Sequence, residues 1–168
     1  MLAIVPEWPE IVHDMPPGGG AGASTATLVA LARAGGFAGD ADTLARACLA
    51  AEGATDPLMH AAPDRLLWAS REARVLRRLP PPPACEVVGG FWGPPERTDP
   101  AETGFPEIDD LVAAWARAVE VKDRARAARI AQESSERRAA GRAGPDPTGA
   151  LARDLGALGH VRAHTGSA

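Results

Sequence analysis

Lysine is almost absent from this chain of 168 residues, which contains a single one, Lys122. A Walker A loop needs a lysine before its final Ser or Thr, because that lysine reaches the outer phosphates of a nucleotide. In the glycine-rich loop of this chain that place is held by Ala23, so a Walker A site is excluded. The net charge of -4 gives no general reason to expect a nucleic-acid partner.

Cysteines and long apolar runs are also scarce. Cys48 and Cys85 are too few for a disulfide scaffold and form no CxxC pair, so we expect reduced, buried thiols. No apolar run is long enough to cross a bilayer, and the N-terminus lacks the pattern of a signal peptide. These absences predict a cytoplasmic protein without membrane contact. The hydrophobic content of 45% can form a core, although much of it is alanine.

Glycine, by contrast, is concentrated in the loop that precedes the first helical pattern. Ser24 and Thr25 follow the loop and open an apolar-periodic stretch. Free N–H groups at a helix start, together with the positive end of the helix dipole, favour a polyphosphate. We therefore predict a nucleotide-phosphate loop whose helix start faces an open cavity. Its expected phosphate-binding residues are Gly18, Gly19, Gly20, Gly22, Ser24 and Thr25.

Two other interpretations of this loop are weaker. A flexible linker would also be rich in Gly and Pro, but this segment passes directly into a helix-forming sequence. The loop satisfies the permissive dinucleotide fingerprint, with Asp40 at a suitable remove for a ribose contact. However, Pro16 and Pro17 separate the glycines from any strand, and no apolar strand leads to Asp40, so the fingerprint fails its structural requirement.

Hydrophobic periodicity predicts an α+β chain. Helices are expected over 24–34, over 42–52 with Asp42 as cap and Gly53 as stop, from Pro106 through Val119, over 122–142, and from Asp146 to Gly159. Strands are expected in a hairpin of 65–69 and 74–79, and again at 85–88 and 161–163.

Two basic or histidine-rich features predict no site of their own. The helix over 122–142 is basic, but it contains acids such as Asp123 and no interleaved aromatics, so we interpret it as a solvated face. His160 and His164 have the spacing of zinc ligands on a helix, but Gly159 and the alternating pattern favour a strand there. With no third ligand nearby, no zinc centre is expected.

Three ordered segments resemble motifs of the GHMP kinases, the superfamily of galactokinase, homoserine kinase and mevalonate kinase. The similarity points to the branch of bacterial L-threonine kinase and propanediol-utilisation proteins. The segments are the loop from Pro16 to Thr27, Glu52-Gly-Ala-Thr-Asp56-Pro-Leu-Met59, and Gly156-Ala-Leu-Gly-His-Val-Arg-Ala-His164-Thr-Gly166-Ser. The resemblance implies the end of an S5-like domain over residues 1–62 and a ferredoxin-like domain over 63–168. The chain looks like such a kinase without its N-terminal motif and its last strand.

The resemblance also implies ATP and Mg²⁺ as the cofactors and assigns roles to particular residues. Ser24 and Glu52 correspond to the Mg²⁺ ligands and Asp56 to the general base. The third motif, His164, Thr165 and Gly166, corresponds to the substrate-contacting turn. Taken alone, Glu52 is better interpreted as a solvated helix-end carboxylate and Asp56 as a turn residue before proline, and only the loop and the family order raise the functional interpretation to an equal alternative.

Two functions are therefore expected as alternatives. The first is an ATP-dependent kinase that transfers the γ-phosphoryl group to an alcohol, L-threonine or a similar small hydroxylated metabolite. The second is a non-catalytic or truncated remnant of such a kinase, with weak nucleotide binding. Because the family covers its loop helix with an N-terminal β segment, we also expect four apolar positions to be partly uncovered: Leu28, Leu31, Leu44 and Leu49. No oligomeric state is predicted.

Overall fold

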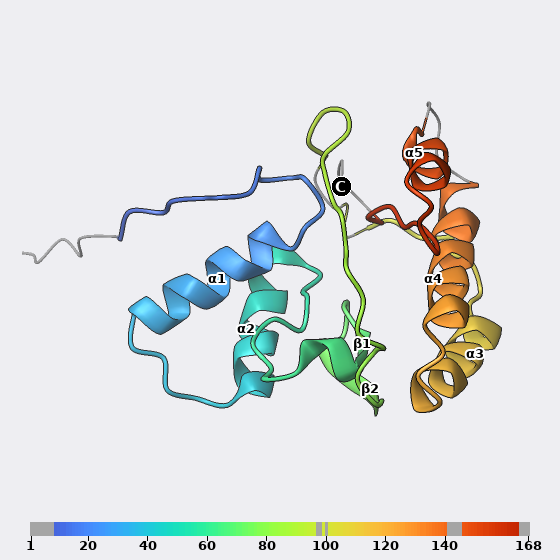
Figure 1. Ribbon diagram of the computed structural model, residues 1–168. Coiled ribbons are helices and arrows are strands. Elements are labelled where there is room, and N and C mark those ends of the chain that lie inside the picture. Colours follow the sequence, from blue (N-terminus) through green and yellow to red (C-terminus); the bar gives the residue numbers. More distant parts are fainter. Residues whose placement is uncertain (1–8, 97–98, 100, 141–145, 165–168) are drawn as a thin grey trace, which may run out of the picture.

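The computed structural model describes residues 9–96, 99, 101–140 and 146–164. Five helices and one antiparallel hairpin make up its regular structure, which is the α+β class that periodicity predicts (Figure 1). The elements are α1 (Ala23–Ala34), α2 (Ala41–Glu52), the short 3-10 turn η1 (Pro63–Arg65), β1 (Leu66–Ala69), β2 (Arg74–Arg78), α3 (Asp109–Glu120), α4 (Arg124–Ala139) and α5 (Thr148–Asp154).

The first helix pair, α1 and α2, is separated by a glycine-rich turn. α1 begins directly after the glycine loop, as predicted. α2 is capped by Asp40, whose carboxylate accepts a hydrogen bond from Thr43 N at 2.7 Å. The prediction of Asp42 as the cap is therefore wrong, because Asp42 already lies inside the first helical turn. Gly53 ends α2 as predicted, with a φ of 79° that favours glycine.

The first hydrophobic core lies between α2, α1 and the hairpin. Leu44 is 3% exposed there, so the expectation that it is uncovered is wrong. Leu28, Leu31 and Leu49 are half-buried. The buried members of this core are Leu44, Ala45, Cys48, Met59 and Ala73.

The hairpin holds the loop that follows α2. Leu66 pairs with Arg78 at the open end of the hairpin, and a bulge interrupts the register before Trp68. Trp68 Nε1 donates to Thr55 O at 2.7 Å, and Thr55 N donates to Ser70 O at 2.9 Å. These two bonds attach the segment after α2 to the hairpin, and Asp56 is the next residue along that segment.

The second helix pair, α3 and α4, encloses a separate core of Leu111, Ala118, Ala127 and Ile130. Asp123 caps α4 by accepting from Arg126 N at 2.9 Å. An ion pair then joins the two helices, since the Arg137 guanidinium donates to both carboxylate oxygens of Asp110 at 2.6 and 2.7 Å. The pKa of Asp110 is lowered, because these hydrogen bonds favour its charged form.

Several predicted boundaries and strands differ from the structure. The segment 85–88 forms no strand, and Cys85 is exposed rather than buried, because no strand of the described chain pairs with this segment. The segment 161–163 is likewise not a strand. α3 starts at Asp109 instead of Pro106, and α5 ends at Asp154, where the chain turns through Gly156 at a φ of 64°.

One aromatic contact connects the hairpin turn with α4. The Phe105 ring lies between two guanidinium groups, with Arg71 Cζ at 4.8 Å and Arg138 Cζ at 5.1 Å from its centroid. Arg138 also forms an ion pair with Glu102. Cation–π contacts of this kind are favourable when the cation is partly desolvated, as the Arg138 side chain is at 13% exposure.

Candidate functional site at the start of the first helix

The glycine loop has alternating backbone conformations. Gly18, Gly20 and Gly22 have φ angles of 79°, 85° and 76°, whereas the residues between them do not have positive φ. Glycine adopts such angles without steric cost. The turn is closed in part by the loop itself, since Gly19 N donates to Pro16 O at 3.1 Å. The chain therefore enters α1 through a tightly turned backbone that requires glycine.

A hydrogen-bond network joins the first turn of α1 to the end of α2. Ser24 Oγ donates to Glu52 Oε2 at 2.5 Å, and Thr25 Oγ1 donates to Glu52 Oε1 at 2.6 Å. Thr25 Oγ1 also accepts from Asp56 N at 3.1 Å. Thr25 is 2% exposed, whereas Ser24 is exposed to solvent. Two consecutive hydroxyl groups thus occupy both oxygens of the last residue of α2.

The Asp56 carboxylate lies directly against the glycine loop. A Cβ atom added to Gly22 would be 3.2 Å from Asp56 Oδ2, so the missing side chain is what lets the carboxylate come so near. The pKa of Asp56 is raised, first because partial burial of the carboxyl group disfavours its charge and second because Glu52 repels that charge. The residue as a whole keeps an exposed side that a small molecule can reach.

The electrostatics of this cluster favour a cation. Glu52 is the last residue of α2 and so lies at the negative end of that helix dipole, which disfavours a carboxylate. Among the described residues, no ion pair involves Glu52 or Asp56. The same residues contain no group of three or more His, Cys, Asp or Glu side chains that could hold a metal ion, so a cation here would need other ligands as well. Two carboxylates and a hydroxyl suit Mg²⁺, which binds through one or two carboxylates and completes its shell with water and phosphate.

Part of the loop is covered by a distant segment of the chain. Glu96 N donates to Gly18 O at 2.8 Å, and a Cβ atom on Gly19 would be 2.5 Å from Phe91 Cε1. Gly19 is consequently buried. The expected open, glycine-lined cavity is therefore covered at Gly19 and partly covered at Gly18.

Only His164 of the third predicted motif is among the described residues, and it lies apart from this network. The His164 carbonyl oxygen accepts from Arg138 at 3.4 Å, which places His164 beside α4. Thr165 and Gly166 lie outside the described residues. The structure thus brings together Gly22, Ser24, Thr25, Glu52 and Asp56, and it does not bring His164 into the same hydrogen bonds.

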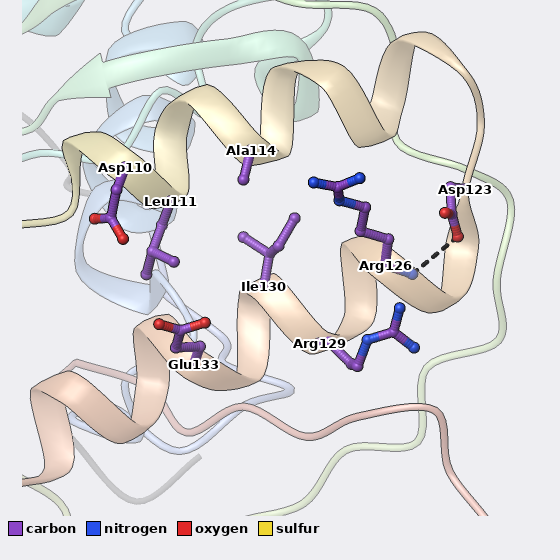
Figure 2. A pocket seen from close by; sticks show the side chains of 8 residues that line it. All are labelled: Asp110, Leu111, Ala114, Asp123, Arg126, Arg129, Ile130 and Glu133. Carbon is purple, nitrogen blue, oxygen red and sulfur yellow. Dashed lines mark hydrogen bonds between the residues drawn. The ribbon is translucent and has the colours of Figure 1, made fainter.

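Two hollows lie elsewhere in the described chain. The larger, about 500 Å³, is a shallow groove between α3 and α4 with Leu111 and Ile130 on its walls, Arg126 and Arg129 at one end and Asp110 at the other (Figure 2). The smaller, about 350 Å³, lies between α1 and residues 9–15. Neither is lined by Glu52, Asp56 or a loop glycine, so these two hollows do not include the carboxylates of the candidate site.

Sequence reasoning missed two residues that shape this cluster, Thr55 and Phe91. Thr55 is 2% exposed, and its Oγ1 lies 3.4 Å from Thr25 Oγ1. Thr55 could have been predicted from its position in the sequence between Glu52 and Asp56. The signal for Phe91 is weaker, because only the Gly89-Gly90 pair before it suggests a chain that returns to approach another backbone.

The comparisons with known proteins add no relative. No protein-family model matches the chain, and neither a curated protein nor a solved structure matches it significantly. Within the part of the chain that the structure describes, no helix has both the length and the apolar character needed to cross a bilayer. The geometry at the start of α1 is therefore the feature from which a function can be inferred.

Proposed function

We propose that this protein is an ATP-dependent small-molecule kinase of the GHMP type. It transfers the γ-phosphoryl group to the hydroxyl of L-threonine or a similar metabolite in the cytoplasm. The observation that carries the proposal is the meeting of Ser24, Glu52 and Asp56 at the glycine-loop end of α1. The finer fold assignment, an S5-like end followed by a ferredoxin-like domain, belongs to the same proposal.

Ser24 and Glu52 are suitably placed to hold Mg²⁺. Mg²⁺ would be held by oxygen ligands that lie close to one another and would leave room for water and phosphate. The Ser24 Oγ and Glu52 Oε2 atoms are 2.5 Å apart, so a small separation lets both face one ion. When bound, Mg²⁺ neutralises phosphate charge. Thr25 keeps its bond to the other Glu52 oxygen and so fixes the direction of that carboxylate.

Asp56 serves as the general base in this proposal. The acceptor hydroxyl oxygen forms a bond to the γ-phosphorus, the bond from that phosphorus to the bridging oxygen of ADP breaks, and the hydroxyl proton moves to Asp56. Its raised pKa suits this role, because a base with a pKa nearer to neutrality holds the proton better. The amides of the loop, which lead into the positive end of α1, bind the phosphates.

A second function is favoured by the saturation of the same network. Ser24, Thr25 and Glu52 already satisfy one another, and the buried hydroxyl of Thr25 needs these bonds whether or not a ligand exists. The cluster would then be a structural link between α1 and α2 in a non-catalytic protein. In that case Glu52 contributes stability and no ligand affinity.

A binding and turnover experiment separates the two functions. Calorimetry measures ATP binding with and without Mg²⁺, and phosphorus NMR follows phosphothreonine formation from L-threonine. We expect Mg²⁺-dependent ATP binding that Glu52→Gln abolishes. The matched control is Glu120→Gln, which changes the exposed last residue of α3 and leaves binding intact.

The general base is tested in the same assay. Asp56→Asn is expected to lower kcat by roughly 10²–10⁴-fold while ATP binding persists. Asp64→Asn, at an exposed position in η1, is the control and keeps wild-type turnover. Equal ATP affinity in wild type and Glu52→Gln, with no product from either, would establish the non-catalytic alternative.

A further inference from the structure

Two consecutive aromatic residues, Phe91 and Trp92, are exposed, and Phe91 packs on the glycine loop. Phe91 is 45% exposed and Trp92 is 58% exposed, although aromatic residues make up only 4% of the chain. An exposed aromatic pair forfeits the burial that usually stabilises such side chains. Neither residue belongs to the two core clusters, and Phe91 packs on Gly19 of the glycine loop instead.

The backbone brings Phe91 to the glycine loop. After β2, the run Pro80–Pro83 stiffens the chain as it leaves the hairpin, and the yellow-green segment then passes the entrance to α1 (Figure 1). One edge of the Phe91 ring, Cε1 and Cδ1, packs on Gly19, and Glu96 N bonds to Gly18 O. The contact on Gly19 therefore fixes one edge of the ring and leaves nearly half of the residue open to solvent.

We propose that Phe91 and Trp92 form the surface on which the base of the bound nucleotide stacks. This inference rests on the proposed nucleotide site and extends it. Phosphates held at Gly22 and the first turn of α1 place the rest of the nucleotide within reach of the neighbouring glycines, where Phe91 lies. Aromatic side chains bind bases by stacking, and the interaction tolerates different bases because each has a π face. The site therefore discriminates little between bases, with comparable affinity for ATP and GTP.

The test compares ligands with and without a base. The probes are Mg-ATP, Mg-GTP and magnesium tripolyphosphate, titrated by calorimetry into the full chain. The variant Phe91→Leu/Trp92→Leu keeps apolar bulk and removes both π systems. We expect it to weaken ATP and GTP binding about tenfold, in the range of one lost stacking contact, and to leave tripolyphosphate binding unchanged.

A control variant and a second readout accompany this titration. Phe105→Leu alters a phenylalanine of nearly equal exposure, 44%, that contacts Arg71 and Arg138 instead of the loop, and it should leave all three affinities unchanged. Quenching of tryptophan fluorescence by ATP, absent in Trp92→Phe, is a second expected readout. Unchanged ATP affinity in the double variant, or equal loss of tripolyphosphate, overturns the stacking surface alone. If the wild type binds none of the three probes, the proposed function and the inference both fail.

Discussion

Replacing Thr25 with valine removes one buried hydroxyl and preserves the shape of the side chain. That hydroxyl donates to Glu52 and accepts from Asp56 N, so the change leaves a carboxylate oxygen and a backbone N–H without their partner. Thr25 is 2% exposed, which means that water does not easily replace the lost group. The variant therefore measures what the link between α1, α2 and the following loop contributes to stability.

The expected loss follows from the two bonds. A hydrogen bond to a charged group contributes about 1.5–3 kcal/mol and a neutral one about 0.5–1.5 kcal/mol. Glu52 is half-buried, so water partly compensates its freed oxygen. We expect Thr25→Val to lower the free energy of unfolding by about 2–3 kcal/mol. In a chain of this length that corresponds to a decrease in Tm of about 5–10 °C.

Urea denaturation followed by circular dichroism gives the free energy, and a thermal scan gives Tm. Thr27→Val is the matched control, because Thr27 lies on the same helix and its hydroxyl donates only to Ala23 O in the preceding turn. Bonds of that kind do not stabilise a helix, so the control should change stability by less than about 0.5 kcal/mol. Equal effects of the two substitutions would refute the proposed importance of the network.

Two further predictions concern single carboxylates. The raised pKa of Asp56 means that the native state binds more protons than the unfolded state above the ordinary value of 3.8, so ionisation of Asp56 destabilises the fold as pH rises. Asp56→Asn should therefore increase the free energy of unfolding at pH 7, by at most about 1 kcal/mol because solvent screens the charge of an exposed residue. This gain in stability should shrink as the pH falls towards 3.8, and a gain that does not depend on pH contradicts the prediction. Asp123→Ala should cost about 1 kcal/mol in a thermal or urea measurement, because Arg126 N loses its cap, whereas unchanged stability would show that α4 does not depend on it.

The elements that sequence patterns predicted well are those governed by neighbouring residues. α1 and the hairpin follow from periodicity, and Gly53 from its conformational freedom. The failures involve choices between equivalent local signals or distant partners. Asp40 and Asp42 both suit a helix cap, and only the bond to Thr43 N distinguishes them. Residues 85–88 have strand-forming character, but a strand also needs a neighbour.

In the candidate site, too, the local features could be predicted from sequence and the long-range contacts could not. The glycine loop and its hydroxyl residues could be singled out from composition and order alone. The approach of Glu52 to Ser24 depends on how α1 packs on α2, across 28 positions of sequence, and periodicity does not specify that packing. The contact of Phe91 with Gly19 spans still more of the chain and follows from a route through prolines and glycines that has no period.

The contacts between consecutive elements determine the order in which parts of the protein can fold during synthesis. The element pairs in most extensive contact, α1 with α2, β1 with β2 and α3 with α4, are each consecutive along the chain. Proteins dominated by such local contacts fold rapidly. During synthesis, α1 and α2 can associate, and Glu52 can meet Ser24, before the ribosome has added α3. The segment with Phe91 and Glu96 emerges later, so the glycine loop forms first and receives its cover afterwards.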